Sequence, residues 1–221
     1  MNKEKVFIII YSFILITELI STSFSIPEMV HFIAKPLLVI SLIIFFINHD
    51  HENTTIKKFV TTALLFSLLG DVLLMFVEIK SSLFIFGLIA FLIAHIMYTL
   101  AFSREKNKKL KWLPILSILS VYGIFFFILL SNSLGNLLIP VSIYIIVILT
   151  MVLFAYLRKG RVIRKSFLLV FLGALLFLSS DSLLAINKFH TPLAFPNIWI
   201  MTTYAYAQLL IVIGVTKSKT L

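Results

Sequence analysis

Five ionisable side chains lie inside long apolar stretches of this sequence. They are Glu18, Lys35, Asp71, His95 and Asp181. At the centre of a membrane-spanning helix such a residue costs roughly 2.5–3.5 kcal/mol on insertion scales, so each one needs a reason to be there. Two enclosed carboxyls can work together as an acid and a base, or they can pass protons along a relay. Asp71 and Asp181 are therefore the residues best suited to carry chemistry.

Four of these residues are predicted to lie at the same depth. Counted along the helical rise from the polar residues that flank each apolar stretch, Glu18, Lys35, Asp71 and Asp181 fall roughly 20–24 Å from one membrane boundary. Glu18 and Lys35 could simply form an ion pair. Two acids at matched depth are harder to explain as structural contacts, so we expect Asp71 and Asp181 to face one interior cavity.

Tyr98, Tyr204 and Gln208 are polar companions inside the same kind of apolar stretch. Tyr204 falls at the depth of the acids, whereas His95 and Gln208 lie one to two turns nearer the boundary. His95 and Tyr98 share a helix face, as do Tyr204 and Gln208. We expect these residues, with Glu18 and Lys35, to contribute to a substrate-binding wall. Taken singly, Tyr98 and Gln208 fit interhelical hydrogen bonds better, which contribute about 0.6 kcal/mol each in membranes.

The elements that must position these residues are membrane-spanning helices. The chain is 61% hydrophobic and only 13% charged over 221 residues, whereas soluble domains are near half apolar and a quarter charged. In lipid the backbone must satisfy its own hydrogen bonds, and continuous apolar runs select helices over barrels. The fold class is therefore an all-α, polytopic membrane bundle. About eight spans are predicted, near residues 6–24, 30–47, 59–77, 83–102, 113–130, 137–157, 167–186 and 197–215.

Basic residues alternate between the connections of these spans. Sixteen of them fall on one side, against Lys80 and Lys188 on the other. This positive-inside pattern places both termini in the cytoplasm, with the protein in a bacterial inner membrane. It also explains the net charge of +10 without a nucleic-acid partner. The N-terminal apolar run is expected to be the first span rather than a cleaved signal, because it is too long for one.

A weak internal repeat is present. Residues 63–74 read A-L-L-F-S-L-L-G-D-V-L-L, and residues 174–184 read A-L-L-F-L-S-S-D-S-L-L. They occupy the third and seventh predicted spans, so a duplication of four plus four helices would give them the same orientation, as parallel repeats require. No separate soluble domain or linker is evident, and residues 1–221 are treated as one integral membrane domain.

Other chemical motifs fail on inspection. The chain has no cysteine, which removes thiolate nucleophiles and thiolate metal sites. His49, Asp50 and His51 resemble a metal clip, but they are better read as a solvated loop. No HExxH, GxSxG, P-loop or GxGxxG motif occurs. We therefore expect neither a metal nor a cofactor.

Taken together, the ordered motifs resemble the YhhN family of membrane proteins over nearly the whole chain. The matching pieces are Lys35-Pro36, the run F-S-L-L-G-D ending at Asp71, and Gly87 with F-x-x-x-H-x-x-Y ending at Tyr98. Further on come G-A-L-L-F-x-x-S-D ending at Asp181 and Y-x-x-x-Q from Tyr204 to Gln208. The resemblance implies an eight-helix, lysoplasmalogenase-like hydrolase. Such enzymes cleave the vinyl ether of lysoplasmalogens to a fatty aldehyde and a glycerophospho-ethanolamine or -choline. It also makes Asp71 and Asp181 the expected catalytic acids.

This reaction matches the polar residues found above. Vinyl ether hydrolysis begins with protonation of the β-carbon and proceeds through an oxocarbenium ion that water attacks. As in glycoside hydrolysis, one carboxyl must be protonated and one ionised. Lys35, with Tyr98 or Tyr204, would hold phosphate or glycerol hydroxyls of a membrane lipid.

Two other classes of function remain open. A proton-coupled transporter or a non-enzymatic lipid-binding protein would use the same acids as a relay. A water path to both membrane faces would favour the transporter, and a pocket open to one leaflet would favour the hydrolase. An intramembrane aspartyl protease would also use two helix-borne aspartates. Its GxGD signature requires glycine where Leu68 stands, and no PAL motif occurs, so this class is less favoured.

Overall fold

The computed structural model describes residues 3–23, 27–49, 51 and 53–219, and within these ranges it contains eight α-helices and one short 3-10 turn. Each helix corresponds to one predicted apolar stretch, because about 20 residues of helix cross the hydrocarbon core. The helices are α1 (Lys3–Ser23), α2 (Glu28–Ile47), α3 (Thr54–Met75), α4 (Leu83–Ser103), α5 (Leu113–Leu134), α6 (Leu138–Leu157), α7 (Arg164–Phe189) and α8 (Pro196–Thr216), with η1 (Gly135–Leu137) between α5 and α6.

Seven stretches of the described chain are long and apolar enough to cross a membrane, and one of them, Leu113–Leu157, is 45 residues long. This stretch doubles back at η1, where Gly135 adopts a φ of 48°, and so provides both α5 and α6. A side chain there would be strained, whereas glycine is not. The all-helical, multi-pass membrane fold predicted from the sequence is confirmed.

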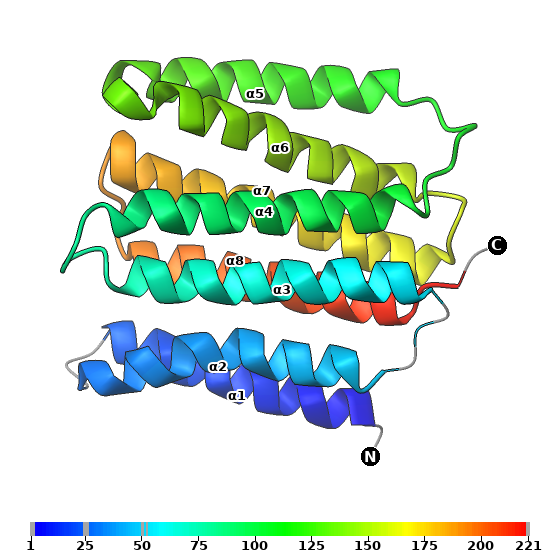
Figure 1. Ribbon diagram of the computed structural model, residues 1–221, viewed down its shortest axis with the longest axis horizontal. Coiled ribbons are helices and arrows are strands. Elements are labelled where there is room, and N and C mark those ends of the chain that lie inside the picture. Colours follow the sequence, from blue (N-terminus) through cyan, green and yellow to red (C-terminus); the bar gives the residue numbers. More distant parts are fainter. Residues whose placement is uncertain (1–2, 24–26, 50, 52, 220–221) are drawn as a thin grey trace.

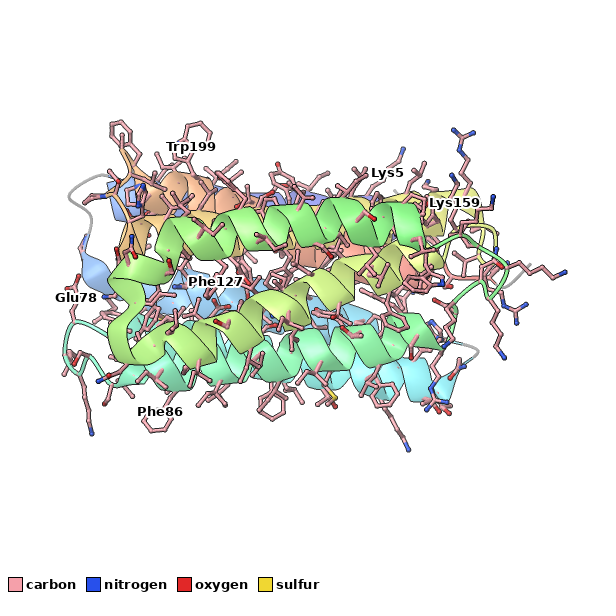
Figure 2. All side chains as sticks on the ribbon, turned by 90° about the horizontal axis from the view of Figure 1, so that it is seen from above. Lys5, Glu78, Phe86, Phe127, Lys159 and Trp199 are labelled. Carbon is pink, nitrogen blue, oxygen red and sulfur yellow. The ribbon has the colours of Figure 1, made fainter. Side chains whose placement is uncertain are left out.

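All eight helices run along one axis (Figure 1). Helices α1 and α2 form one side of the bundle, α5 and α6 form the other, and α3, α4, α7 and α8 lie between them. The N-terminal helix begins, and the last helix ends, at the same end of the bundle. The connections α2–α3, α4–α5 and α6–α7 lie at that end too, and Figure 2 shows Lys5 and Lys159 there and Glu78 at the other. We call the end with Lys5 and Lys159 the basic end, and the opposite end, named after Glu78, the acidic-rim end.

Glycines allow close packing of the two helix pairs that contact each other most, α3 with α4 and α7 with α8. A Cβ on Gly70 would lie 2.6 Å from the ring of Phe91, and one on Gly214 would lie 2.9 Å from the backbone nitrogen of Val170. Small residues of this kind allow close approach of helices in lipid. The two pairs correspond under a shift of four helices, in agreement with the predicted repeat, which stays a prediction.

A buried ion pair joins three segments at the basic end. Arg158, which follows α6 and is fully buried, donates to Glu105 at 2.8 Å and to the hydroxyl of Ser166 at 2.9 Å. Ser218 donates to the other carboxylate oxygen of Glu105. Burial lowers the pKa of Arg158 and Glu105 raises it, and the guanidinium stays charged. This network fastens the α4–α5 connection to α7 and the C-terminal end of α8.

Helix boundaries differ from the predicted spans by up to five residues. The largest difference is at the start of α3, which begins at Thr54 rather than at residue 59. The side chain of Asn53 accepts hydrogen bonds from the backbone of Thr55 and Ile56, which caps the helix ahead of its apolar part. Two predicted features, the end of the first span at Phe24 and the loop residue Asp50, lie outside the described residues.

Candidate functional site

A cavity of about 310 Å³ opens in the half of the bundle that faces the acidic-rim end. Its walls come from α1, α2, α3, α4, α7 and α8, with the α3–α4 connection, so segments far apart in the sequence meet around it. Five of the sequence-predicted site residues line it: Glu18, Lys35, Asp71, Asp181 and Tyr204.

Asp71 sits at the floor of this cavity, one turn before the end of α3, and is 2% exposed. The hydroxyl of Tyr204 on α8 donates a hydrogen bond to its Oδ2 at 2.7 Å. The preceding residue, Gly70, leaves room for the ring of Phe91, which packs edge-on against Tyr204 at 5.8 Å between centroids. The glycine before the acid therefore helps to fix the tyrosine that holds it.

Asp181 on α7 reaches the same cavity from the other half of the chain. Its side chain is 14% exposed, and the hydroxyl of Tyr144 on α6 donates to its Oδ2 at 2.5 Å. The carboxyls of Asp71 and Asp181 line the same cavity. Each aspartate thus receives a phenol hydrogen bond from a different neighbouring helix.

His95 lies behind Asp181 and is not among the residues that line the cavity. Its Nε2 is 3.6 Å from Oδ2 of Asp181, and the imidazole is fully buried against Phe177 and Tyr144. Neither ring nitrogen has a side-chain hydrogen-bond partner among the described residues, and the imidazole interacts with the backbone of Phe91. A small movement of the carboxyl would let the two groups share a proton.

Tyr98 and Gln208 also lie beneath the cavity surface, in a buried chain of hydrogen bonds. Tyr98 donates to Oε1 of Gln208 at 2.5 Å, and Nε2 of Gln208 lies 3.4 Å from the hydroxyl of Tyr204. The tyrosine in turn donates to Asp71. This chain orients the acid from α4 and α8, and of its members Tyr204 and Asp71 line the cavity whereas Tyr98 and Gln208 do not.

Glu18 does not pair with Lys35. Its Oε1 lies 2.8 Å from Nδ1 of His31 on α2, and its Oε2 has no hydrogen-bond partner among the described residues. Lys35 forms no ion pair within the described part of the chain, although it interacts electrostatically with Asp71. Around the cavity there are therefore a cation without an ion-pair partner and a buried carboxylate oxygen without a hydrogen-bond partner among the described residues.

A second, smaller cavity of about 50 Å³ adjoins the first. Phe84, Asp181 and Leu184 line both. Apart from Tyr122, Tyr144, Asp181 and Ser182, its walls are hydrocarbon or phenyl groups from α4, α5, α6 and α7. Asp181 therefore stands where a polar compartment meets an apolar one.

The polar cavity has its rim at one end of the bundle. Glu78, Lys188 and Asn197 are exposed there, and Figure 2 shows Glu78 at this end. Another cavity lies at the basic end around Lys159 and Arg164, and it shares no lining residue with the polar one.

Two residues of this site were not singled out from the sequence. Tyr144 lies inside a predicted span, as Tyr98 and Tyr204 do, and its depth was the signal available. His31 lies one helical turn before Lys35, on the same face of α2. Among the described residues no group of three or more histidines, cysteines or acids is arranged to hold a metal.

Most of the chain is similar in sequence to known membrane proteins. The sequence model of the YhhN family matches residues 30–215. The lysoplasmalogenase TMEM86B of Sus scrofa is 33% identical over 196 residues, covering 88% of this chain and 79% of the relative. Lysoplasmalogenase TMEM86A of Bos taurus is 29% identical over 202 residues (87% and 81%), and a lysoplasmalogenase of Mycobacterium tuberculosis is 31% identical over 166 residues (72% and 60%). No solved structure matches the chain.

Proposed function

Because the chain belongs to the YhhN family, we propose that it is a lysoplasmalogenase-like membrane hydrolase that cleaves the vinyl ether of a lysoplasmalogen with the pair Asp71 and Asp181. The relatives named above are lysoplasmalogenases. The observation that carries the proposal is the position of Asp181, which borders both the polar cavity and the apolar one. The vinyl ether of a lysoplasmalogen also lies between a polar and an apolar part, since it joins a hydrocarbon chain to a polar glycerophosphate.

In the proposed reaction Asp181 is the general acid. Its place beside the apolar cavity brings it next to the alkenyl chain, and it transfers a proton to the β-carbon of the double bond. The bond electrons go to that new C–H bond, and the ether oxygen shares the positive charge of the α-carbon as an oxocarbenium ion. Two neighbouring carboxyls are suited to this task, one to give a proton and one to stabilise the cation.

Asp71 then acts as the base. It takes a proton from a water molecule as the water oxygen bonds to the α-carbon, which gives a hemiacetal. As the C–O bond to glycerol breaks, Asp71 gives its proton to the glycerol oxygen, and Asp181 takes the hydroxyl proton as the aldehyde forms, which restores both carboxyls. One water is consumed and no net proton. Tyr204 and Tyr144 orient the two carboxyls throughout.

Lys35 supports the binding half of the proposal. Its ammonium lines the polar cavity without an ion-pair partner among the described residues. The substrate phosphate would supply that partner through charge-assisted hydrogen bonds. The lipid headgroup would then lie in the polar cavity, with its chain toward the apolar cavity.

The one-ended polar cavity favours a hydrolase over a proton-coupled transporter. A transporter needs access from both membrane faces, whereas this cavity shares no lining residue with the one at the basic end. We further propose that the chain forms one integral domain of a bacterial inner membrane, with the basic end in the cytoplasm. The polar cavity would then open toward the outer face.

The proposal is tested by measuring aldehyde release from a lysoplasmalogen by purified protein, beside an ordinary ester lysophospholipid. We expect aldehyde from the vinyl ether alone, because the ester lipid lacks the double bond that is protonated. Asp71→Asn and Asp181→Asn should each lower the rate by about 10²–10⁴-fold. Folded protein that releases no aldehyde from any lysoplasmalogen headgroup, or wild-type rates in both variants, would contradict the mechanism.

A further inference from the structure

Glu18 is a buried acid that the proposed reaction does not use. Its side chain is fully enclosed on α1, yet it belongs to the wall of the polar cavity. One oxygen is hydrogen-bonded to His31 and the other, Oε2, has no partner among the described residues. An unpaired carboxylate oxygen in such a place is costly unless a ligand satisfies it.

The nearby lysine of the cavity wall, Lys35, has no ion-pair partner among the described residues either. Lys35 lines the same cavity on α2, one turn after His31, and it forms no ion pair with Glu18 or with another described acid. A cation and an anion that face one cavity without meeting each other are matched by a ligand that carries both charges. A phosphate bound to Lys35 and an ammonium bound to Glu18 would satisfy both groups.

We propose that Glu18 is the receptor for the primary amine of a phosphoethanolamine headgroup, and so sets headgroup specificity. The inference rests on the proposed function and deepens it. The ammonium donates to Oε2 of Glu18 while the phosphate contacts Lys35. A choline headgroup has no N–H to donate, so it forgoes the hydrogen bond and retains only the charge attraction.

His31 controls access to this receptor. Its imidazole is 26% exposed while the Glu18 side chain is 0% exposed. In the proposal, the amine reaches the buried Oε2 after the His31 side chain moves aside. Thr22, which lies one turn after Glu18, also lines the cavity and bonds its hydroxyl to the backbone of Glu18 rather than to the carboxylate. The carboxylate is thus left to the ligand.

The test uses binding rather than turnover, so that it is independent of the chemistry. The probes are three saturated 1-O-alkyl lysolipids, which lack the vinyl ether and cannot be cleaved. They carry phosphoethanolamine, phosphocholine or phosphate alone. For wild-type protein in detergent, the ethanolamine lipid should bind about tenfold or more tightly than the phosphate lipid, and several-fold more tightly than the choline lipid. Equal affinities for the ethanolamine lipid and either other lipid would overturn the proposal without any variant.

Three variants locate the effect. Glu18→Gln keeps the size of the side chain and should abolish the preference for the ethanolamine lipid. Lys35→Met should lower the affinity for all three lipids by a similar factor. Glu78→Gln removes the exposed carboxylate of the rim and should leave the preference intact. A preference lost in Glu78→Gln but kept in folded Glu18→Gln would assign the amine to the rim and overturn the proposal. A protein that prefers the ethanolamine lipid but releases no aldehyde would contradict the proposed reaction and still support this inference.

Discussion

At the scale of single residues, the candidate site is two carboxyls held by two phenols. Tyr204 holds Asp71 and Tyr144 holds Asp181, and the four side chains come from four different helices. Such a pair is expected to act as a unit, because the proposed reaction needs both an acid and a base.

The effects of replacing the two aspartates on the rate should therefore not be additive. The double variant Asp71→Asn with Asp181→Asn should be little slower than the slower single variant, since each single change already stops the shared reaction. Aldehyde release from a lysoplasmalogen, measured for all three proteins at one pH, gives the comparison. A double variant slower by the product of the two single effects would mean that the aspartates act independently.

Replacing Tyr204 should slow the reaction more than replacing Tyr206 on the same helix. Tyr204→Phe removes the donor to Asp71 and breaks the chain to Gln208, so the rate should fall about ten- to hundredfold. Tyr206→Phe is the matched control, because Tyr206 is 43% exposed on the lipid-facing side of α8. Equal rates for the two variants would show that the phenol of Tyr204 is dispensable.

At the scale of helices, glycines decide how closely the elements approach. Gly214 on α8 packs against α7, where a Cβ would lie 2.6 Å from Cγ2 of Val170 and 2.9 Å from its backbone nitrogen. Gly123 on α5 is different, because a Cβ there would come within 3 Å only of the flexible end of Leu149.

These two glycines give a matched pair of substitutions. Gly214→Ala should destabilise the fold by about 1–3 kcal/mol, because backbone cannot move aside as a side chain can. Gly123→Ala should change stability by less than about 1 kcal/mol, since alanine also favours the helix. Thermal unfolding in detergent measures both, and the reverse order of the two effects would contradict the packing of α7 on α8.

At the scale of the whole molecule, the polar cavity and the basic connections lie at opposite ends of the bundle. The native chain has no cysteine, so single cysteines can report on each end without background. Glu78 and Lys188 are exposed at the acidic-rim end, and Arg104 and Lys159 are exposed at the basic end.

Membrane sidedness should follow this division. Glu78→Cys and Lys188→Cys should react with an impermeant maleimide added to intact cells, and Arg104→Cys and Lys159→Cys should react only after the membrane is opened. Reporter fusions after Arg104 and after Lys159 should both read cytoplasmic, because basic loops remain inside. Labelling of Lys159→Cys in intact cells would reverse the proposed orientation.

The sequence by itself determined the membrane class, the number of helices and the layer in which the polar residues gather. These depend on the length of apolar runs and on helical rise, which are local properties. It also predicted a common depth for Asp71, Asp181, Lys35, Glu18 and Tyr204. These are the predicted site residues that line the polar cavity.

Only the tertiary structure decided which way each polar side chain points. Glu18 meets His31 rather than Lys35, His95 lies behind Asp181, and Tyr144 joins the site from α6. The physical reason is that lipid tails are as apolar as a helix interface, so the apolar pattern of a membrane helix does not fix its rotation about its own axis. Close packing at residues such as Gly70 and Gly214 fixes that rotation, and it depends on partners distant in the sequence.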